Sequence, residues 1–249
     1  MDAAHLALVG AAALAGGAIN AIAGGGSLVT FPVLVACGVP AILASATNTV
    51  ALCPGYLGAT FAQRRLIAEQ RDRVERFVPL AVVGGILGAI LLLDTNPHTF
   101  DIVVPFLLVF AVALLAFQDR IRAAMPAALG KDAVAAGMLG IAAIYGGYFG
   151  AGLGVIILAV LAVATRDELV KLNALKQAIS LGVNVAAAAL FVVRAPLDYE
   201  IVGVMAVGAL AGGLGGGAIA SRVSSKLLRG VVIVVGLAVA AVYAVKLLR

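Results

Sequence analysis

The sequence has little charge and no long polar stretch. Of its 249 residues, 12% are charged and 63% are hydrophobic, and the mean hydropathy is +1.16. Soluble globular domains are about 45–50% apolar and about 25% charged. The shortage of charge therefore argues against a soluble fold. Apolar runs long enough for membrane helices of about 20 residues recur along the chain, and the period-two alternation of a membrane barrel is absent.

Cysteine, tryptophan and basic residues near the N-terminus are also scarce. The two cysteines, Cys37 and Cys53, lie in apolar segments and indicate neither a disulfide framework nor a metal site. The first residues, MDAAHLALVG, lack the basic region of a signal peptide, so the first apolar run is expected to be retained. The basic segments are short, and they lack the aromatic side chains on which nucleic-acid bases stack. Nucleic acid is therefore not a predicted partner. No cofactor and no metal are predicted.

The few charges lie between apolar segments and predict how the chain is oriented. The separators at 64–76, 119–131 and 221–229 hold most of the Lys and Arg, whereas 94–101 has none and 194–200 has only Arg194. Short loops rich in Lys and Arg stay in the cytoplasm. The first three separators are therefore predicted inside and the other two outside. The apolar segments themselves are 6–37, 40–63, 77–93, 100–118, 132–164, 170–193, 199–220 and 230–248.

Two of these segments contain glycine-rich breaks. The first reads AIAGGGSLVTFP around Gly24–Gly26, and the second reads IYGGYFGAGLG over 144–154. Each glycine costs a helix about 1 kcal/mol relative to Ala. Segment 132–164 is too long for one span, and the charged loops require an odd number of crossings between 132 and 193. A segment that enters, turns at the glycines and leaves on the same side satisfies that requirement.

The breaks and spans divide the chain into two similar halves. IAGGGSLVTFPVL in the first half resembles FGAGLGVIILAVL in the second. The predicted fold is an all-α integral membrane protein with two inverted repeats, residues 1–118 and 132–249. Each repeat is a Gly-broken re-entrant helical segment followed by three transmembrane helices, a layout typical of secondary transporters. Whether residues 6–23 span fully or re-enter is left open by the sequence.

The breaks predict a binding site for a small anion. Unwound backbone inside a membrane is tolerated only where protein buries it or a cavity lies beside it. Helices that begin after Gly26 and Gly154 would direct N–H groups and positive dipole ends into such a cavity. The alternative is that the glycines only allow close helix packing.

Lys176 is the charge most deeply placed within an apolar segment. An intramembrane charge indicates function, although a lysine that snorkels to the interface is the alternative. All twelve acidic residues fall in loops or at segment ends, so the chemistry suits an oxyanion rather than a metal cation. The predicted substrate-binding residues are Asn20, Gly24, Gly25, Gly26, Ser27, Asn48, Thr49, Gly150, Gly152, Lys176 and Gln177.

Catalysis is not predicted. An enzyme needs an acid–base or nucleophile–base set within the spans, and neither a buried histidine nor a carboxylate pair is visible. The glycine strings at 82–90 and 207–221 have small-xxx-small spacing and favour tight helix packing. A homodimer through Gly-rich helices is a further prediction.

Three sequence blocks resemble one known family. GGAINAIAGGGSLVTFPVLVACGVPAILASATNTVALCPGYLGA (16–59), GGYFGAGLGVIILAVL (146–161) and the LNALKQ span resemble the TauE/SafE sulfite exporters. The family's motifs fall on Asn20, Gly24–Ser27, Thr47–Thr49, Gly150–Gly154 and Ala174–Lys176. In many relatives Ser or Thr precedes the second-half lysine, whereas Leu175 stands there in this chain.

The resemblance implies a transporter of sulfite or of an organosulfonate such as sulfoacetate in the bacterial cytoplasmic membrane. The function expected is export by alternating access, in which Lys176 neutralises the anion and Asn48, Thr49 and Gln177 donate hydrogen bonds. The alternative is a passive small-anion channel with the same cavity. The predicted partners are the small anionic substrate and the lipid bilayer.

Overall fold

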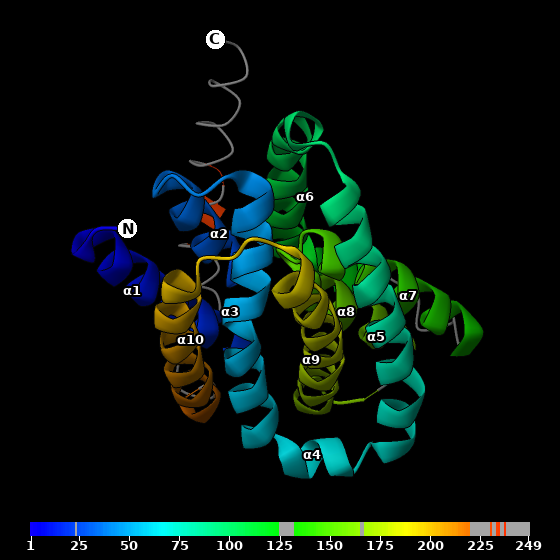
Figure 1. Ribbon diagram of the computed structural model, residues 1–249. Helices are drawn as coiled ribbons and strands as arrows, with labels where there is room; N and C mark the ends of the chain where they lie inside the picture. The colour runs from blue at the N-terminus through cyan, green and yellow to red at the C-terminus, as the bar shows by residue number, and fades with distance from the viewer. Residues whose placement is uncertain are drawn as a thin grey trace.

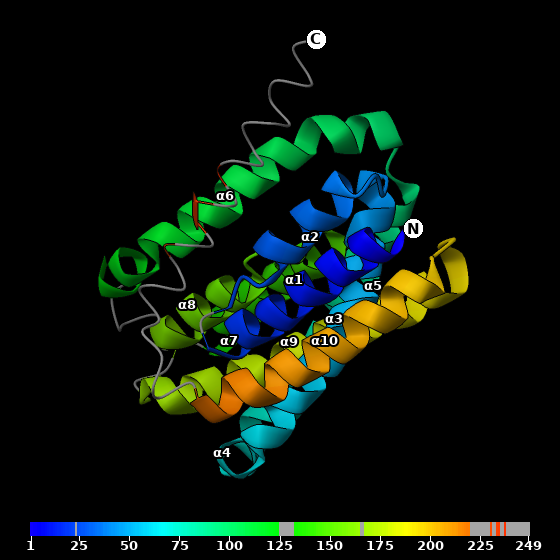
Figure 2. The ribbon, with the colours of Figure 1, turned by 90° about the vertical axis from the view of Figure 1, so that its left-hand side faces the viewer.

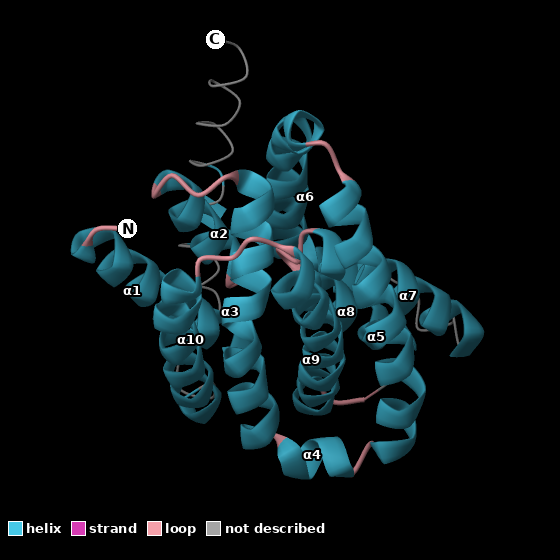
Figure 3. Cartoon of the chain, in the orientation of Figure 1, coloured by secondary structure: helices cyan, strands magenta, loops and turns pink. Residues whose placement is uncertain are grey.

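The computed structural model describes residues 1–22, 24–124, 132–164 and 167–219, together with Gly230, Ile233, Val234 and Leu237. All regular secondary structure within this part of the chain is helical (Figure 3). The predicted separator at 221–229 lies outside the described residues. So do most of the separator at 119–131 and all but four residues of the predicted span at 230–248.

Ten helices are assigned within the described residues. They are α1 (Ala3–Ile22), α2 (Ser27–Ala36), α3 (Ala41–Ala62), α4 (Arg64–Ala68), α5 (Arg71–Asp94), α6 (Pro97–Ala124), α7 (Asp132–Tyr148), α8 (Leu153–Ala164), α9 (Leu169–Arg194) and α10 (Tyr199–Ile219). Five of them, α1, α5, α6, α9 and α10, are long and apolar enough to cross a membrane. The prediction of an all-helical, multi-pass chain is thus confirmed.

Helix α3 has the length of a span but not the hydropathy of the five. It is 22 residues long and carries Ser45, Thr47, Asn48 and Thr49 in its first half. All four side chains are buried. Helix α3 packs against α1, α9 and α10 (Figure 1), so neighbouring helices rather than lipid surround its polar residues.

The basic separator at 64–76 is helical rather than a loop. Helix α4 and the first turns of α5 occupy it, and they lie beside the start of α9 (Figure 1). Arg73 pairs with Asp167, and Gln70 Nε2 donates to the Lys171 carbonyl at 3.0 Å. We call this end of the bundle, residues 63–73 and 167–171, the basic face.

The other end of the bundle is formed by three turns. They surround a pocket of about 900 Å³ whose lining includes Val39, Thr95 and Arg194. We call this end, residues 38–40, 95–97 and 194–198, the opposite face. Helices α3, α5 and α9 therefore run from one face to the other (Figure 1), and Figure 2 shows α1 lying alongside α10.

The first broken segment is a hairpin that enters from the opposite face. Gly208, Gly212 and Gly216 of α10 lie against Gly10, Leu14 and Ala18 of α1, so the two helices run in the same direction. Since α10 starts at the opposite face, α1 does too, and α2 leads back to it. Helix α1 has 20 residues, a length of about 30 Å. Its first residues are exposed, and it ends in the interior of the bundle, where the chain turns.

The second broken segment enters from the basic face. Gly84 and Gly88 of α5 lie against Ala143 and Ile144 of α7, so these two helices also run in the same direction. Helix α5 starts at the basic face, so α7 enters from there and α8 returns. The two hairpins thus enter from opposite ends, whereas the internal repeat of the sequence stays a prediction.

The glycine strings pack within the chain. A methyl group added to Gly212 would lie 2.0 Å from the Leu14 carbonyl oxygen, and one added to Gly88 would lie 2.0 Å from that of Ile144. Small residues let helix backbones approach this closely.

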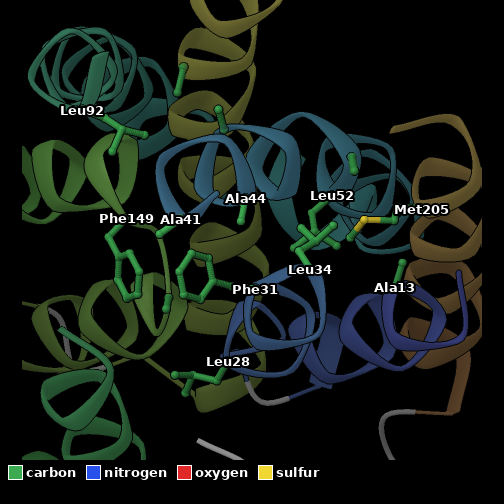
Figure 4. Packing of buried hydrophobic residues seen from close by; sticks show 14 of the residues in the cluster. Ala13, Leu28, Phe31, Leu34, Ala41, Ala44, Leu52, Leu92, Phe149 and Met205 are labelled. Atoms are coloured by element: carbon green, nitrogen blue, oxygen red, sulfur yellow. The ribbon is translucent and has the colours of Figure 1, made fainter. Parts of the chain in front are cut away.

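Larger side chains fill the remaining core, where the rings of Phe31 and Phe149 meet edge-on with centroids 5.1 Å apart (Figure 4). The homodimer remains a prediction.

The orientation of the two faces can be tested by cysteine labelling. In a variant with Cys37 and Cys53 replaced by Ser, Tyr199→Cys is expected to react with a membrane-impermeant maleimide in intact cells. Glu75→Cys is expected to react only after permeabilisation, because the separator at 64–76 is predicted inside. Both native side chains are well exposed. Labelling in the reverse pattern would contradict the orientation.

The close approach of α1 and α10 predicts the effect of a single added side chain. The side chain added by Gly212→Val has no room between α1 and α10. The overpacking should lower the free energy of unfolding by about 1–3 kcal/mol or more. Gly203→Val on the same helix is the matched control, because nothing lies within 4 Å of the added carbon there. The apparent unfolding midpoint in detergent, measured at one scan rate, should fall for Gly212→Val only. Equal midpoints for the two variants would argue against this packing.

Candidate functional site

Each chain reversal depends on two glycines with left-handed backbone conformation. The φ angles are +78° and +94° at Gly24 and Gly25, and +73° and +76° at Gly150 and Gly152. Glycine adopts this region readily because it has no Cβ, whereas other residues are strained there. The sequence pattern therefore ends α1 and α7 and starts the short helices α2 and α8.

The two reversals meet in the interior of the bundle. A methyl group added to Gly24 would lie 3.3 Å from both the Gly154 carbonyl carbon and the Val155 nitrogen. Gly24, Gly25 and Gly154 are all buried. Hairpins that enter from the two faces thus contact each other backbone to backbone, and even a methyl group between them would be tightly packed.

Helix α9 supplies the hydrogen bonds that the end of α1 lacks. The last carbonyls of a helix have no partner within it. Lys176 Nζ and Gln177 Nε2 both donate to the Asn20 carbonyl at 3.3 Å, and Gln177 Nε2 also lies 3.3 Å from the Ala21 carbonyl. These two side chains therefore close the carbonyl end of the first reversal.

The side chain of Asn20 closes the other half of the same reversal. Its Oδ1 accepts a hydrogen bond from the Gly26 N–H at 2.7 Å. The Thr30 hydroxyl lies against the Gly26 carbonyl at 3.3 Å and contacts Asn48 Oδ1 on α3. Asn20 and Thr30 thus connect α1, α2 and α3 around the reversal, and all these side chains are buried.

The electrostatic balance at the reversals favours an anion. Lys176 is 1% exposed and is the one charged side chain among the buried residues of the described part of the chain. Its stem lies beside Gly154, near the start of α8. A helix N-terminus carries about +0.5 charge and a C-terminus about −0.5. The ends of α1 and α7 offset part of the positive charge, while the starts of α2 and α8 add to it, so the charge of Lys176 itself makes the balance positive.

Several predicted site residues lie around the reversals without touching Lys176. Thr49 donates to the Ser45 carbonyl of its own helix at 3.0 Å, so its hydroxyl proton is already used. Gly25 and Gly152 lie against Leu115 and Ala111 of α6. Ser27 is buried at the start of α2, and Gly150 accepts from the Leu153 N–H.

Two buried hydroxyl residues, one beside the first glycine break and one on α9, are missing from the predicted binding residues. Thr30 is four residues after Gly26, and Ser180 is four after Lys176. Helical spacing of i+4 places each on the same face as its predicted neighbour, so this spacing could have identified both.

Among the described residues, no group of three His, Cys, Asp or Glu side chains could hold a metal ion.

The fold and these contacts define a class of protein. Broken helices around a buried polar site, inside a bundle of apolar spans, are the architecture of a multi-pass membrane transporter. The comparison with known families is more specific: the sulfite exporter TauE/SafE family matches residues 8–243, and the chain belongs to this family.

Relatives of the chain carry similar descriptions. The probable membrane transporter protein YfcA of Escherichia coli K12 is 27% identical over 233 residues, which cover 90% of this chain and 83% of the relative. A probable membrane transporter protein of Haemophilus influenzae is 27% identical over 87% of this chain and 85% of its own length. One from Sinorhizobium, ORF9, is 24% identical over 94% and 90%. No solved structure matches the chain significantly.

The contact between Asn20 and Gly26 predicts a stability effect. Asn20→Leu leaves the buried Gly26 N–H without its acceptor. The loss should lower the free energy of unfolding by about 1–3 kcal/mol. Asn20→Asp keeps an acceptor oxygen at the same place and is the matched control. The unfolding midpoint of the purified protein should fall for Asn20→Leu and stay higher for Asn20→Asp. The same midpoint for Asn20→Leu and the wild type would show that this bond does not hold the reversal.

Proposed function

We propose that this chain is a secondary transporter that exports a small sulfur oxyanion, sulfite or an organosulfonate such as sulfoacetate, across the bacterial cytoplasmic membrane. The observation that carries the proposal is Lys176, a buried cation beside the place where the two glycine reversals meet. A buried charge without a carboxylate partner is costly. A bound anion would offset that cost.

The anion would lie near the Lys176 ammonium and the starts of α2 and α8. The same residues that the sequence predicts for binding surround this place: Asn20, Gly24–Ser27 and Gln177 on one side, with Gly150 and Gly152 in the second reversal. Asn48 and Thr49 belong to α3, and Asn48 reaches the first reversal through Thr30. Their part is therefore to support the reversal in which the anion binds.

The hairpins suit alternating access. One enters from each face, and the site lies where they meet. Lys176 is 1% and Gln177 0% exposed, so the site is closed from the surface in this conformation. Movement of one hairpin and its attached helices would open the site towards one face, and movement of the other would open it towards the second.

A passive channel is the competing function. The relatives are described as transporters, which favours a carrier. Flux measured against imposed gradients in proteoliposomes separates the two functions, because a channel only lets its ion run down the electrochemical gradient. Saturation at low substrate concentration and acceleration of efflux by external substrate are expected for the carrier. Flux that follows the electrochemical gradient without saturation would identify the protein as a channel instead.

The role of Lys176 can be tested by removing its charge. Lys176→Met keeps the aliphatic stem beside Gly154 and should lower sulfite flux in proteoliposomes at least about tenfold, the equivalent of about 1.4 kcal/mol. Lys171→Met, on the same helix but half-exposed at the basic face, is the control and should transport normally. Anions should raise the unfolding midpoint of the wild type and not that of Lys176→Met. Undiminished flux through Lys176→Met would contradict the proposed site.

A further inference from the structure

The amide of Gln177 is held in one orientation by the end of α1. Its Nε2 lies 3.3 Å from the carbonyl oxygens of both Asn20 and Ala21. Rotating the amide by half a turn would place Oε1 against these two oxygens, which repel it. The nitrogen is therefore committed to α1, and Gln177 has no free N–H with which to bind an anion as the sequence predicted.

The oxygen of the same amide is left without a partner. Gln177 is 0% exposed, and its Oε1 makes no hydrogen bond within the described structure. One turn further along α9, the hydroxyl of Ser180 is also fully buried and unpartnered. Leaving a buried polar group unpaired is costly. Two such groups on the same helix as the buried Lys176 indicate that a ligand pairs with them.

The position of these groups distinguishes them from a similar case elsewhere. Gln70 also donates through Nε2 to two carbonyls and has an unpartnered Oε1. It lies at the basic face, where α4 meets α9, and neither a buried cation nor a glycine reversal accompanies it. At Gln177 the acceptor oxygen belongs to the residue next to Lys176, and both side chains converge on the Asn20 carbonyl.

A ligand for this site has to satisfy an ammonium group and an acceptor oxygen together. Lys176 offers positive charge and N–H donors, whereas Gln177 Oε1 only accepts hydrogen bonds. An anion whose oxygens are all deprotonated leaves Gln177 Oε1 unpaired and places negative charge beside it. A monoanion that keeps one O–H group satisfies both. The Ser180 hydroxyl can donate to either kind of anion, but it can accept only from the anion that carries a proton.

We propose that the site selects a singly charged oxyanion that still carries a hydroxyl proton, such as hydrogen sulfite, over anions that have no such proton. The O–H group donates to Gln177 Oε1 while the charged oxygens face Lys176. This inference rests on the proposed function and narrows it. Within the proposed substrate class, it favours hydrogen sulfite over sulfite dianion and over an organosulfonate, whose sulfonate group is fully deprotonated at neutral pH.

The groups that could disturb a pH-dependent measurement lie away from the site. Lys176 is the one charged side chain buried in the described part of α9. The charged groups on the helices that contact α9 lie at their ends: Arg64, Arg65, Arg71, Asp72, Arg73, Glu75, Arg76 and Asp94 on α4 and α5, Asp132 at the first residue of α7, and His5 on α1. Titration of Lys176 would affect every anion, so a ratio of two anions cancels it.

The experiment compares two anions of the same size class in proteoliposomes. Sulfite gains or loses a proton near neutral pH, whereas methanesulfonate carries the same charge throughout. Flux of each is measured about one pH unit below and about one above the pKa at which hydrogen sulfite loses its proton. The ratio of sulfite to methanesulfonate flux should fall about tenfold between the two conditions, because the protonated fraction falls by that factor.

A variant assigns this preference to Gln177. Gln177→Met removes the acceptor oxygen and should reduce the sulfite-to-methanesulfonate ratio at the lower pH by about three- to tenfold, the range expected for one hydrogen bond. Gln70→Met, which removes an equivalent amide at the basic face, should leave the ratio unchanged. Methanesulfonate flux through Gln177→Met also reports whether the variant is folded, and Gln177→Leu provides a second apolar replacement if it is not.

The outcomes separate this inference from the function on which it rests. A flux ratio that does not depend on pH in the wild type, or that Gln177→Met leaves unchanged, would overturn the selectivity while the transporter stands. Transport of neither anion, with no stabilisation by either, would overturn both. A lower ratio for Gln177→Met, with the Gln70→Met ratio at the wild-type value, would support the site as proposed.

Discussion

The backbone groups exposed where α1 ends are the constraint on which this structure depends. A helix that stops inside an apolar bundle leaves carbonyl and N–H groups without partners, and no lipid can satisfy them. Lys176 and Gln177 of α9 satisfy the carbonyls, and the side chain of Asn20 satisfies the Gly26 N–H. The side chains that hold the reversal together are therefore the same ones that give the site its charge and polarity.

Close helix packing brings these groups together. The α1–α10 and α5–α7 contacts have no room for side chains at Gly212 and Gly88. Each contact fixes one hairpin against a helix that runs from face to face, so that the two reversals meet at Gly24 and Gly154. The end of α1 also offsets part of the positive charge of Lys176, because a helix C-terminus is partly negative. Such a moderate site would suit the proposed carrier, which has to release its anion as well as bind it.

Much of the fold could be predicted from residue patterns. Runs of apolar residues located α5, α6, α9 and α10, and triple glycines located the end of α1. Lys176 and Gln177 stood out because charge and amide groups are costly inside an apolar segment. Other features could not be predicted. The basic separator forms α4 and the start of α5, since Arg and Glu favour helices as readily as loops. Thr30 and Ser180 resemble ordinary small residues until their neighbours are known.

The sequence by itself determined the class of protein, the number and approximate place of most helices, and which residues are too polar for their surroundings. These properties follow from composition and from local backbone preferences. Only the tertiary structure decided what each polar group does, because a hydrogen bond needs a partner that is distant in the chain. Gln177 shows the difference: the sequence predicts a donor to the anion, whereas α1, more than 150 residues away in the chain, uses that donor and leaves an acceptor.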